Sequence, residues 1–220
     1  MEGILKLKRR HFNALLSLLA STGSLASAQT ASKSAAVLVV GDSLSAEYGL
    51  KRGSGWVQIL QQRLVKERIP AHMVNAGISA DTSSGGRSRL PALLKLHKPA
   101  IVVLELGAND ALRGLPLTMT RDNLTAMARL SREAGARVVI VGMQVPPNYG
   151  GKYTQDFREV FKTVATAEKA ALVPFLLKGV ADLADPTLLF QEDRIHPNEA
   201  AQPTLANNVW AVLAPMLPKR

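Results

Sequence analysis

The sequence of 220 residues contains no cysteine, has only 5% aromatic residues and has fewer acidic than basic side chains. Without cysteine the chain can form no disulfide, no cysteine-ligated zinc or iron–sulfur site and no thiol nucleophile. A hydrophobic content of 47% is too high for a disordered chain. The length suits one domain and is short for two. These absences leave a single globular domain whose chemistry does not depend on sulfur.

Basic residues outnumber acidic ones by 27 to 17, and the formal net charge of +10 raises the question of an acidic partner. Part of this charge lies in a basic N-terminal stretch, which is followed by the apolar run 12–20 and by Ala26-Ser27-Ala28. The run is too short to span a membrane as a helix, and the order of the three parts is typical of a secretory signal peptide. We therefore predict a cleaved signal over residues 1–28 and one domain over 29–220. Arg9-Arg10 also fits a twin-arginine signal, so both export routes stay open.

Cleavage after Ala28 would remove four cations and one anion and lower the formal charge from +10 to +7. The remaining basic residues are scattered and are not interleaved with aromatic residues, as they would be on a nucleic-acid-binding face. We therefore predict an exported protein, periplasmic or secreted, with no nucleic-acid partner and no stable insertion in the membrane after cleavage. The sequence gives no indication of the oligomeric state.

Short apolar runs alternate with amphipathic stretches along the predicted domain. Continuous rather than alternating apolar residues favour strands that are covered on both faces, as in a parallel sheet. The expected strands are 35–40, 73–76, 100–106, 137–141 and a weaker one at 171–173. Helical spacing is found at 56–64, 89–96, 120–134, 156–169 and 198–213. This alternation predicts a three-layer α/β/α sandwich with a doubly wound parallel sheet of about five strands, as in flavodoxin-like folds.

Polar and glycine residues follow the ends of these strands, where open parallel sheets carry their active sites. Ser43, in Gly41-Asp42-Ser43-Leu44, comes directly after the first strand. In Asp193-Arg194-Ile195-His196 the aspartate can accept the imidazole N–H, which leaves the second ring nitrogen to take a serine proton. Alone, each piece is more often a turn or cap residue. Together they predict a catalytic triad of Ser43, His196 and Asp193.

An acyl-transfer site also needs hydrogen-bond donors for the oxyanion that develops on the carbonyl. Asn109, in Gly107-Ala108-Asn109-Asp110 after the third strand, can offer its side-chain amide. The loop 75–82 can bring a backbone N–H close, and the N–H of Ser43 is a further donor. The final histidine motif has no second metal ligand beside it, so neither a metal nor another cofactor is predicted.

These motifs resemble those of the GDSL, or SGNH, hydrolase family. Gly41-Asp42-Ser43-Leu44 is similar to its first block, Gly107-Ala108-Asn109-Asp110 to its third and Asp193-Arg194-Ile195-His196-Pro197 to its last. The similarity extends over nearly the whole predicted domain to the bacterial periplasmic branch of thioesterases, arylesterases and lysophospholipases. The resemblance implies the SGNH-hydrolase fold, Ser43, Asp193 and His196 as the triad, and Asn109 in the oxyanion hole. The expected substrate is a small-molecule acyl ester or a lipid-like ester.

One position departs from the family pattern. The second block of this branch reads N-A-x-[IV]-S-G-D-T, and its glycine falls on Ala80 of Asn75-Ala76-Gly77-Ile78-Ser79-Ala80-Asp81-Thr82. Alanine keeps the backbone N–H that the oxyanion hole needs, but it would be strained if the position required a positive φ. We expect Ala80 to be the second backbone donor, with Gly77 as the alternative.

The resemblance also implies that the segments 110–117 and 145–150 line a linear acyl groove. This assigns substrate contacts to Asp110, Leu112, Leu115, Pro147, Asn148 and Tyr149. A stiff loop after the fourth strand is an equally good interpretation of the paired prolines. Two other functions stay open: a carbohydrate-ester deacetylase of the same fold, and a non-catalytic binding module in which residues 82–87 hold an anion.

Overall fold

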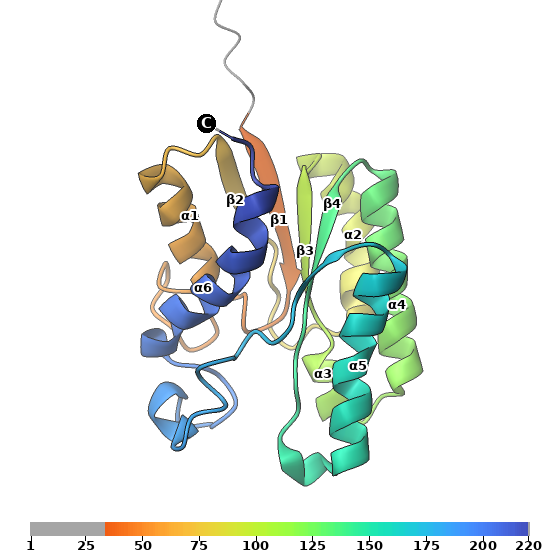
Figure 1. Cartoon of the computed structure of the whole chain (residues 1–220), viewed down its shortest axis with the longest axis vertical. Coiled ribbons are helices and arrows are strands. Elements are labelled where there is room, and N and C mark those ends of the chain that lie inside the picture. The colour runs from red at the N-terminus through yellow and green to blue at the C-terminus, as the bar shows by residue number, and fades with distance from the viewer. Residues whose placement is uncertain (1–33, 220) are drawn as a thin grey trace, which may run out of the picture. The chain divides into compact units, whose positions relative to one another are not determined.

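A parallel sheet of five strands lies at the centre of the computed structural model, which describes residues 34–219 (Figure 1). The strand order is β2-β1-β3-β4-β5. The strands are β1 (Ala35–Gly41), β2 (Ala71–Asn75), β3 (Ile101–Glu105), β4 (Arg137–Val141) and β5 (Ala171–Val173). The predicted signal peptide, residues 1–28, lies outside the described residues.

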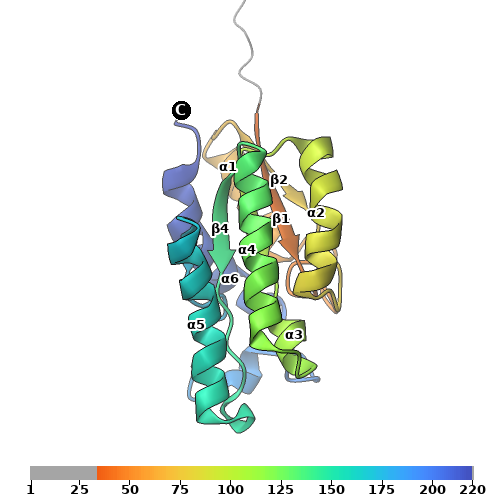
Figure 2. The ribbon, with the colours of Figure 1, turned by 90° about the vertical axis from the view of Figure 1, so that its right-hand side faces the viewer.

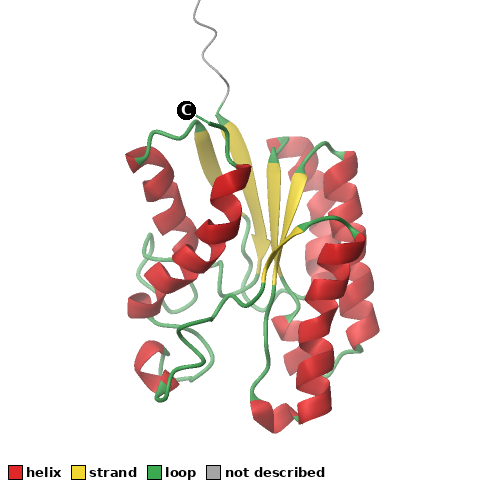
Figure 3. Cartoon of the chain, in the orientation of Figure 1, coloured by secondary structure: helices red, strands yellow, loops and turns green. Residues whose placement is uncertain are grey.

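Helices cover both faces of this sheet, so the predicted three-layer α/β/α sandwich is confirmed (Figure 3). The helices α1 and α6 pack together on one face, and α2, α4 and α5 cover the other (Figures 1 and 2). The α-helices are α1 (Trp56–Lys66), α2 (Ser83–His97), α3 (Ala108–Leu112), α4 (Leu117–Glu133), α5 (Gly151–Ala167) and α6 (Gln202–Leu213). Single 3₁₀ turns lie at 147–149, 186–189, 199–201 and 214–216.

The core explains why the strand sequences are continuously apolar. Every residue of β3 is buried, and so is every residue of β1 after Ala35, because helices cover both sides of each strand. The helices contribute their largest apolar side chains to the same core, with Trp56, Phe157 and Phe161 at no more than 1% exposure. The sheet is therefore a rigid support for the loops that leave its ends.

The helix α2 differs from the expected one, because it begins at Ser83 rather than at Arg89. The side chain of Thr82 caps the helix by accepting a hydrogen bond of 3.3 Å from the N–H of Gly85. Residues 83–87 thus belong to a helix and do not form an anion-holding loop. Gly86 faces the core, where a Cβ atom would collide with the side chain of Leu106. Gly86 therefore serves the packing of α2 on the core, and the helix corrects the interpretation of this segment as an anion-holding loop.

The strand order also fixes where the loops converge. In the sheet β1 has β2 on one side and β3 on the other. The direction in which the chain adds strands to the sheet therefore reverses between β1 and β3. The loops after these three strands leave from the same end of the sheet because all strands are parallel. They begin with Asp42, Ala76 and Leu106. A crevice at such a switch point is the usual binding site of this architecture.

Candidate active site

Ser43 lies on a tight turn directly after β1. The carbonyl oxygen of Asp42 accepts hydrogen bonds from the N–H groups of Ser45 and Ala46, at 3.2 and 2.9 Å, and these bonds close the turn. Ser43 itself is half-buried. Its hydroxyl Oγ is 2.9 Å from Nε2 of His196, although the two residues are 153 positions apart in the sequence. The predicted nucleophile and base are thus within hydrogen-bonding distance.

Asp193 binds the other ring nitrogen of the histidine. Its Oδ2 is 2.6 Å from Nδ1 of His196, and its Oδ1 accepts the backbone N–H groups of Ile195 and His196 at 2.9 and 3.0 Å. Partial desolvation opposes ionisation, but these hydrogen bonds and the nearby imidazole prevail and lower the pKa of Asp193 to about 2. The ionised carboxylate therefore fixes the orientation of the imidazole over the whole neutral range.

Two further contacts hold the histidine loop in place, and the sequence analysis did not find them. The ring of Tyr48 lies against that of His196, with 4.5 Å between the ring centroids. Gln191 donates from Nε2 to the carbonyl oxygens of Tyr48 and Pro197, at 2.9 and 3.2 Å. The segment after Ser43 and the segment around His196 are thereby joined directly. Neither Tyr48 nor Gln191 carries a sequence signal, because the contacts join segments distant in the chain.

The side chain of Asn109 lies between the loops that follow β1 and β2. Its Nδ2 donates to the carbonyl oxygen of Asp81 at 2.9 Å and to Oδ2 of Asp42 at 3.2 Å. Asn109 follows Gly107, whose φ of 121° is accessible to glycine and begins α3. The amide predicted as an oxyanion donor is therefore held beside the turn that carries Ser43.

The sequence left Ala80 and Gly77 of the loop 75–82 as alternative backbone donors, and their N–H groups differ in the structure. The N–H of Gly77 is already engaged, because it donates to Oδ1 of Asn75 at 2.9 Å. Within residues 34–219 the N–H groups of Ala80 and Ser43 have no acceptor. Ala80 has a φ of 62°, in the left-handed region that favours glycine. Glycine, which the resembled family pattern has at this position, would adopt this conformation without strain.

Arg89 of α2 clamps the same loop, and sequence analysis missed it as well. Its guanidinium contacts Oδ2 of Asp81 at 2.8 Å and donates to the carbonyl oxygens of Ala76 at 2.5 Å and Gly41 at 3.1 Å. The side chains of this ion pair are 19% and 11% exposed, so solvent screens the pair only partly. Arg89 thus connects the ends of β1 and β2 and orders the backbone that carries Ala80.

The residues predicted to contact the substrate differ in their burial. Asp110 is fully buried, and its carboxylate accepts hydrogen bonds from the backbone N–H and hydroxyl of Ser83 and from the hydroxyl of Thr120. Its assignment to the substrate pocket is therefore wrong, because the side chain ties α2 and α4 to α3 inside the protein. Leu112, Asn148 and Tyr149 are exposed and Leu115 is half-buried. The side chain of Pro147 lies outside the part of the structure that is described.

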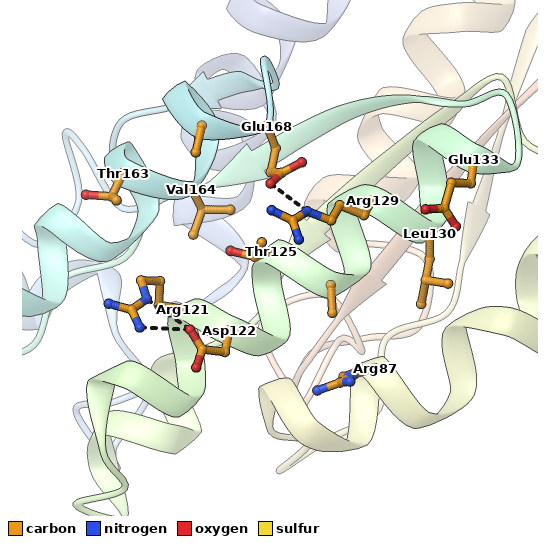
Figure 4. Close-up of a pocket in the computed structure, with 12 residues that line it drawn as sticks. Arg87, Arg121, Asp122, Thr125, Arg129, Leu130, Glu133, Thr163, Val164 and Glu168 are labelled. Atoms are coloured by element: carbon orange, nitrogen blue, oxygen red, sulfur yellow. Dashed lines mark hydrogen bonds and ion pairs between the residues drawn. The ribbon is translucent and has the colours of Figure 1, made fainter.

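A cavity of about 630 Å³ lies away from these residues, on the helical face formed by α2, α4 and α5 (Figure 4). Its charged lining is largely neutralised internally, since Arg129 pairs with Glu168 and Arg121 with Asp122, each at 2.9 Å. A second cavity of about 280 Å³ lies beside α1 and β2. Neither is lined by Ser43, His196 or Asn109. Within residues 34–219 no group of three or more potential metal ligands is found.

Fold and site together define a class of protein: serine hydrolases built on a flavodoxin-like parallel sheet, with the serine after the first strand and the histidine near the end of the chain. The particular family follows from comparison with known proteins. Residues 39–202 match the GDSL-like lipase/acylhydrolase family, and the chain belongs to this family.

Individual relatives extend over most of the chain. An esterase, TesA of Pseudomonas aeruginosa, is 51% identical over 181 residues, which cover 82% of this chain and 89% of the relative. An arylesterase of Vibrio mimicus is 39% identical over 79% of this chain and 85% of the relative. Thioesterase 1/protease 1/lysophospholipase L1 of Escherichia coli is 36% identical over 82% and 84%. A crystal structure of TesA, 51% identical, has a TM-score of 0.79 and covers 83% of this chain and 99% of that one.

The left-handed backbone at Ala80 yields a stability prediction. Ala80→Gly removes a Cβ atom that disfavours a positive φ, and we expect the free energy of unfolding to rise by about 0.5–1 kcal/mol. The melting temperature, measured by circular dichroism, should rise by about 2–4 °C.

Ala126→Gly is the matched control, because Ala126 lies within the regular helix α4. The same chemical change there should lower the free energy of unfolding by about 0.5–1 kcal/mol. Equal destabilisation by both substitutions would contradict a strained backbone at Ala80.

Proposed function

We propose that the protein hydrolyses acyl esters and thioesters through an acyl-enzyme intermediate on Ser43. The observation that carries this proposal is the unbroken contact from Asp193 through His196 to Ser43, at 2.6 and 2.9 Å. Membership of the acylhydrolase family supports it, and so do the relatives named as an esterase, an arylesterase and a thioesterase/lysophospholipase. The substrate class is a small-molecule or lipid-like acyl ester.

The reaction takes two steps at one serine. Nε2 of His196 removes the proton of the Ser43 hydroxyl while Oγ attacks the carbonyl carbon of the ester. The resulting tetrahedral intermediate collapses, and the imidazolium gives its proton to the departing alkoxide or thiolate. Water then attacks the acyl-serine with His196 again as the base, which releases the carboxylic acid and restores Ser43. Asp193 stabilises the imidazolium that forms in both steps.

The oxyanion receives hydrogen bonds from the N–H groups of Ser43 and Ala80 and from the amide of Asn109. The two backbone donors have no other acceptor among residues 34–219, so they need not break an existing bond. The Asn109 amide must redirect a hydrogen that contacts Asp42 or Asp81 in the free protein. The two backbone donors are in place before the reaction, and such donors stabilise charge that is present only in the transition state.

Activity on a panel of p-nitrophenyl esters and acyl thioesters tests this function. Ser43→Ala should reduce kcat by at least about 10³-fold and abolish covalent labelling by a fluorophosphonate probe. Asn109→Ala should reduce kcat by about 10²–10³-fold and keep the labelling site, because it removes a donor and not the nucleophile. Turnover of the Ser43→Ala protein at the wild-type rate would refute the proposal.

The acyl chain of the substrate is proposed to lie along Leu112, Leu115 and Tyr149, in the segments that follow β3 and β4. Leu112 and Tyr149 are 40% and 39% exposed, so both present apolar surface that a ligand can reach. Leu115 is partly covered, and its backbone is anchored by a hydrogen bond of 2.9 Å from its N–H to the carbonyl oxygen of Asp110. Apolar surface at these positions would be covered by a bound acyl chain.

Enlarging Leu115 tests the placement of the acyl chain. Leu115→Trp should lower kcat/KM for long-chain relative to short-chain p-nitrophenyl esters by roughly tenfold, because the larger side chain occupies the space of several methylene groups. Leu96→Trp is the control, since Leu96 is exposed near the far end of α2. If Leu115→Trp leaves the dependence of kcat/KM on acyl-chain length unchanged, this placement of the acyl chain is contradicted.

We further propose that the protein is exported and acts in the periplasm or outside the cell. The basic, apolar and small-residue order of residues 1–28 supports this proposal. Within the described residues no helix is both long and apolar enough to cross a membrane. The same residues contain no cysteine, so the oxidising environment would leave the fold unchanged.

Sequencing the N-terminus of protein recovered from the periplasm or medium tests export. The mature chain should begin at Gln29. Replacing Arg9 and Arg10 by lysine should block export only if the twin-arginine route is used. Recovery of a chain that still begins at Met1, in the cytoplasm alone, would contradict a cleaved signal.

A further inference from the structure

The catalytic triad leaves two acidic residues beside Ser43 without a role. One is Glu105, the last residue of β3, whose side chain is completely buried. It pairs in register with Gly41 of β1 and lies under the turn that carries Ser43. Gly41 makes room for it, because a Cβ atom there would be 2.7 Å from Oε2 of Glu105. An acidic residue in an otherwise apolar strand is expensive to bury and calls for a function.

The contacts of Glu105 reach both sides of the nucleophile. Its Oε2 accepts a hydrogen bond of 2.7 Å from the hydroxyl of Ser45 and one of 3.3 Å from the backbone N–H of Asp42. Its Oε1 is buried and has no partner among residues 34–219. Neither partner of the carboxyl group is a cation. Glu105 therefore braces the turn on either side of Ser43, and the bonds that it makes are neutral ones.

The second acidic residue is Asp42, which is 1% exposed and directly precedes the nucleophile. Its Oδ1 accepts the backbone N–H of Leu44 at 3.0 Å, and its Oδ2 accepts Nδ2 of Asn109 at 3.2 Å. The two acids thus form a continuous path from β3, through the turn of Ser43, to the amide of Asn109. In the described part of the chain, neither acid makes a hydrogen bond with a side chain of the triad.

We propose that Asp42 and Glu105 are a positioning pair: Asp42 orients the amide of Asn109 beside Ser43, and Glu105 fixes the turn that presents both Ser43 and Asp42. This inference rests on the oxyanion role proposed above for Asn109. It adds two residues that neither bind the substrate nor exchange protons with it, but set the geometry of the groups that do. Gly41 belongs to the same arrangement, because a Cβ atom at this position would collide with the carboxyl group of Glu105.

The electrostatic environment supports this division of roles. Burial raises the pKa of Glu105 well above its usual value, and the neighbouring Asp42 raises it further. Burial also raises the pKa of Asp42 to about 6. The hydrogen bond from the Leu44 N–H and the charge of His196 lower this pKa, and the charges of Asp81 and Asp110 raise it. Of the two acids, Asp42 therefore ionises the more readily, because it has donors around it, whereas burial favours the neutral form of Glu105. A second charge under the oxyanion would oppose the reaction.

Charge-neutral substitution tests the part assigned to Glu105. Glu105→Gln preserves the shape and neutrality of the protonated acid and should keep most of the kcat that Glu105→Ala loses. As the pH rises above about 4.5, the wild-type protein should lose stability relative to Glu105→Gln, because its unfolded state gives up the Glu105 proton at a lower pH than its folded state does. The difference in melting temperature between the two proteins should therefore grow as the pH rises.

An infrared spectrum of the wild-type protein makes the same test without any variant having to fold. In the wild-type protein a carbonyl band of a protonated carboxyl group should remain at pH values above the usual pKa range of glutamate. Absence of this band from the wild-type spectrum, or a melting difference that does not change with pH, would overturn the assignment of Glu105.

A double-mutant cycle tests the part assigned to Asp42. Asp42→Asn replaces the carboxylate, whose Oδ2 accepts a hydrogen bond from the Asn109 amide, by an amide group. The value of kcat should then fall by about 10- to 100-fold, and KM should change by less than about threefold. In the Asn109→Ala background the same substitution should have little further effect, because the side chain that it positions is gone. Asp122→Asn, on the exposed side of α4, is the matched control and should leave kcat unchanged.

The cycle separates the two proposals on which it rests. If Asn109→Ala leaves kcat intact, the oxyanion role of Asn109 fails. If Asn109→Ala lowers kcat but Asp42→Asn has its full effect in both backgrounds, Asn109 keeps its role and the positioning pair is overturned. Circular dichroism of each variant reports whether it is folded.

Discussion

The parallel pairing of β1 with β3 is the constraint on which the rest of the structure depends. It places Gly41 in register with Glu105, at the point where the strand order reverses. The segments after both strands therefore leave side by side, one with Ser43 and the other with Asn109. Because helices bury both faces of these strands, their ends cannot shift independently. The rigid sheet thus presents the nucleophile and an oxyanion donor from two separate parts of the chain.

The acidic side chains have different roles because their surroundings differ. Asp193 is 37% exposed and receives two backbone N–H groups, so it stays ionised and orients His196. Asp110 is buried among hydrogen-bond donors and joins three helices. Glu105 is buried without a cation and is stable when protonated. Desolvation and the number of donors, not proximity to Ser43, distinguish these groups.

Sequence analysis was most successful where the chain repeats a simple physical pattern. Continuous apolar runs identified the strands, since strands that are covered on both faces are mostly apolar. The start of α2 was missed because the glycines of residues 82–87 suggested a loop, whereas Thr82 caps a helix there. Asp110 was misplaced because a motif gives the order of residues but not the direction of each side chain. Glu105 did leave a signal, as the single charge within an apolar strand.

The sequence by itself determined the class of fold, the end of the sheet where chemistry takes place and the residue types that carry it. These follow from hydrophobic periodicity and from local motifs, which involve neighbours in the chain. Only the tertiary structure decided that Ala80 has a left-handed backbone, that the N–H of Gly77 is engaged, and that Tyr48 lies against His196. Such facts depend on contacts between distant segments, and these contacts exist only once the sheet has brought the segments together.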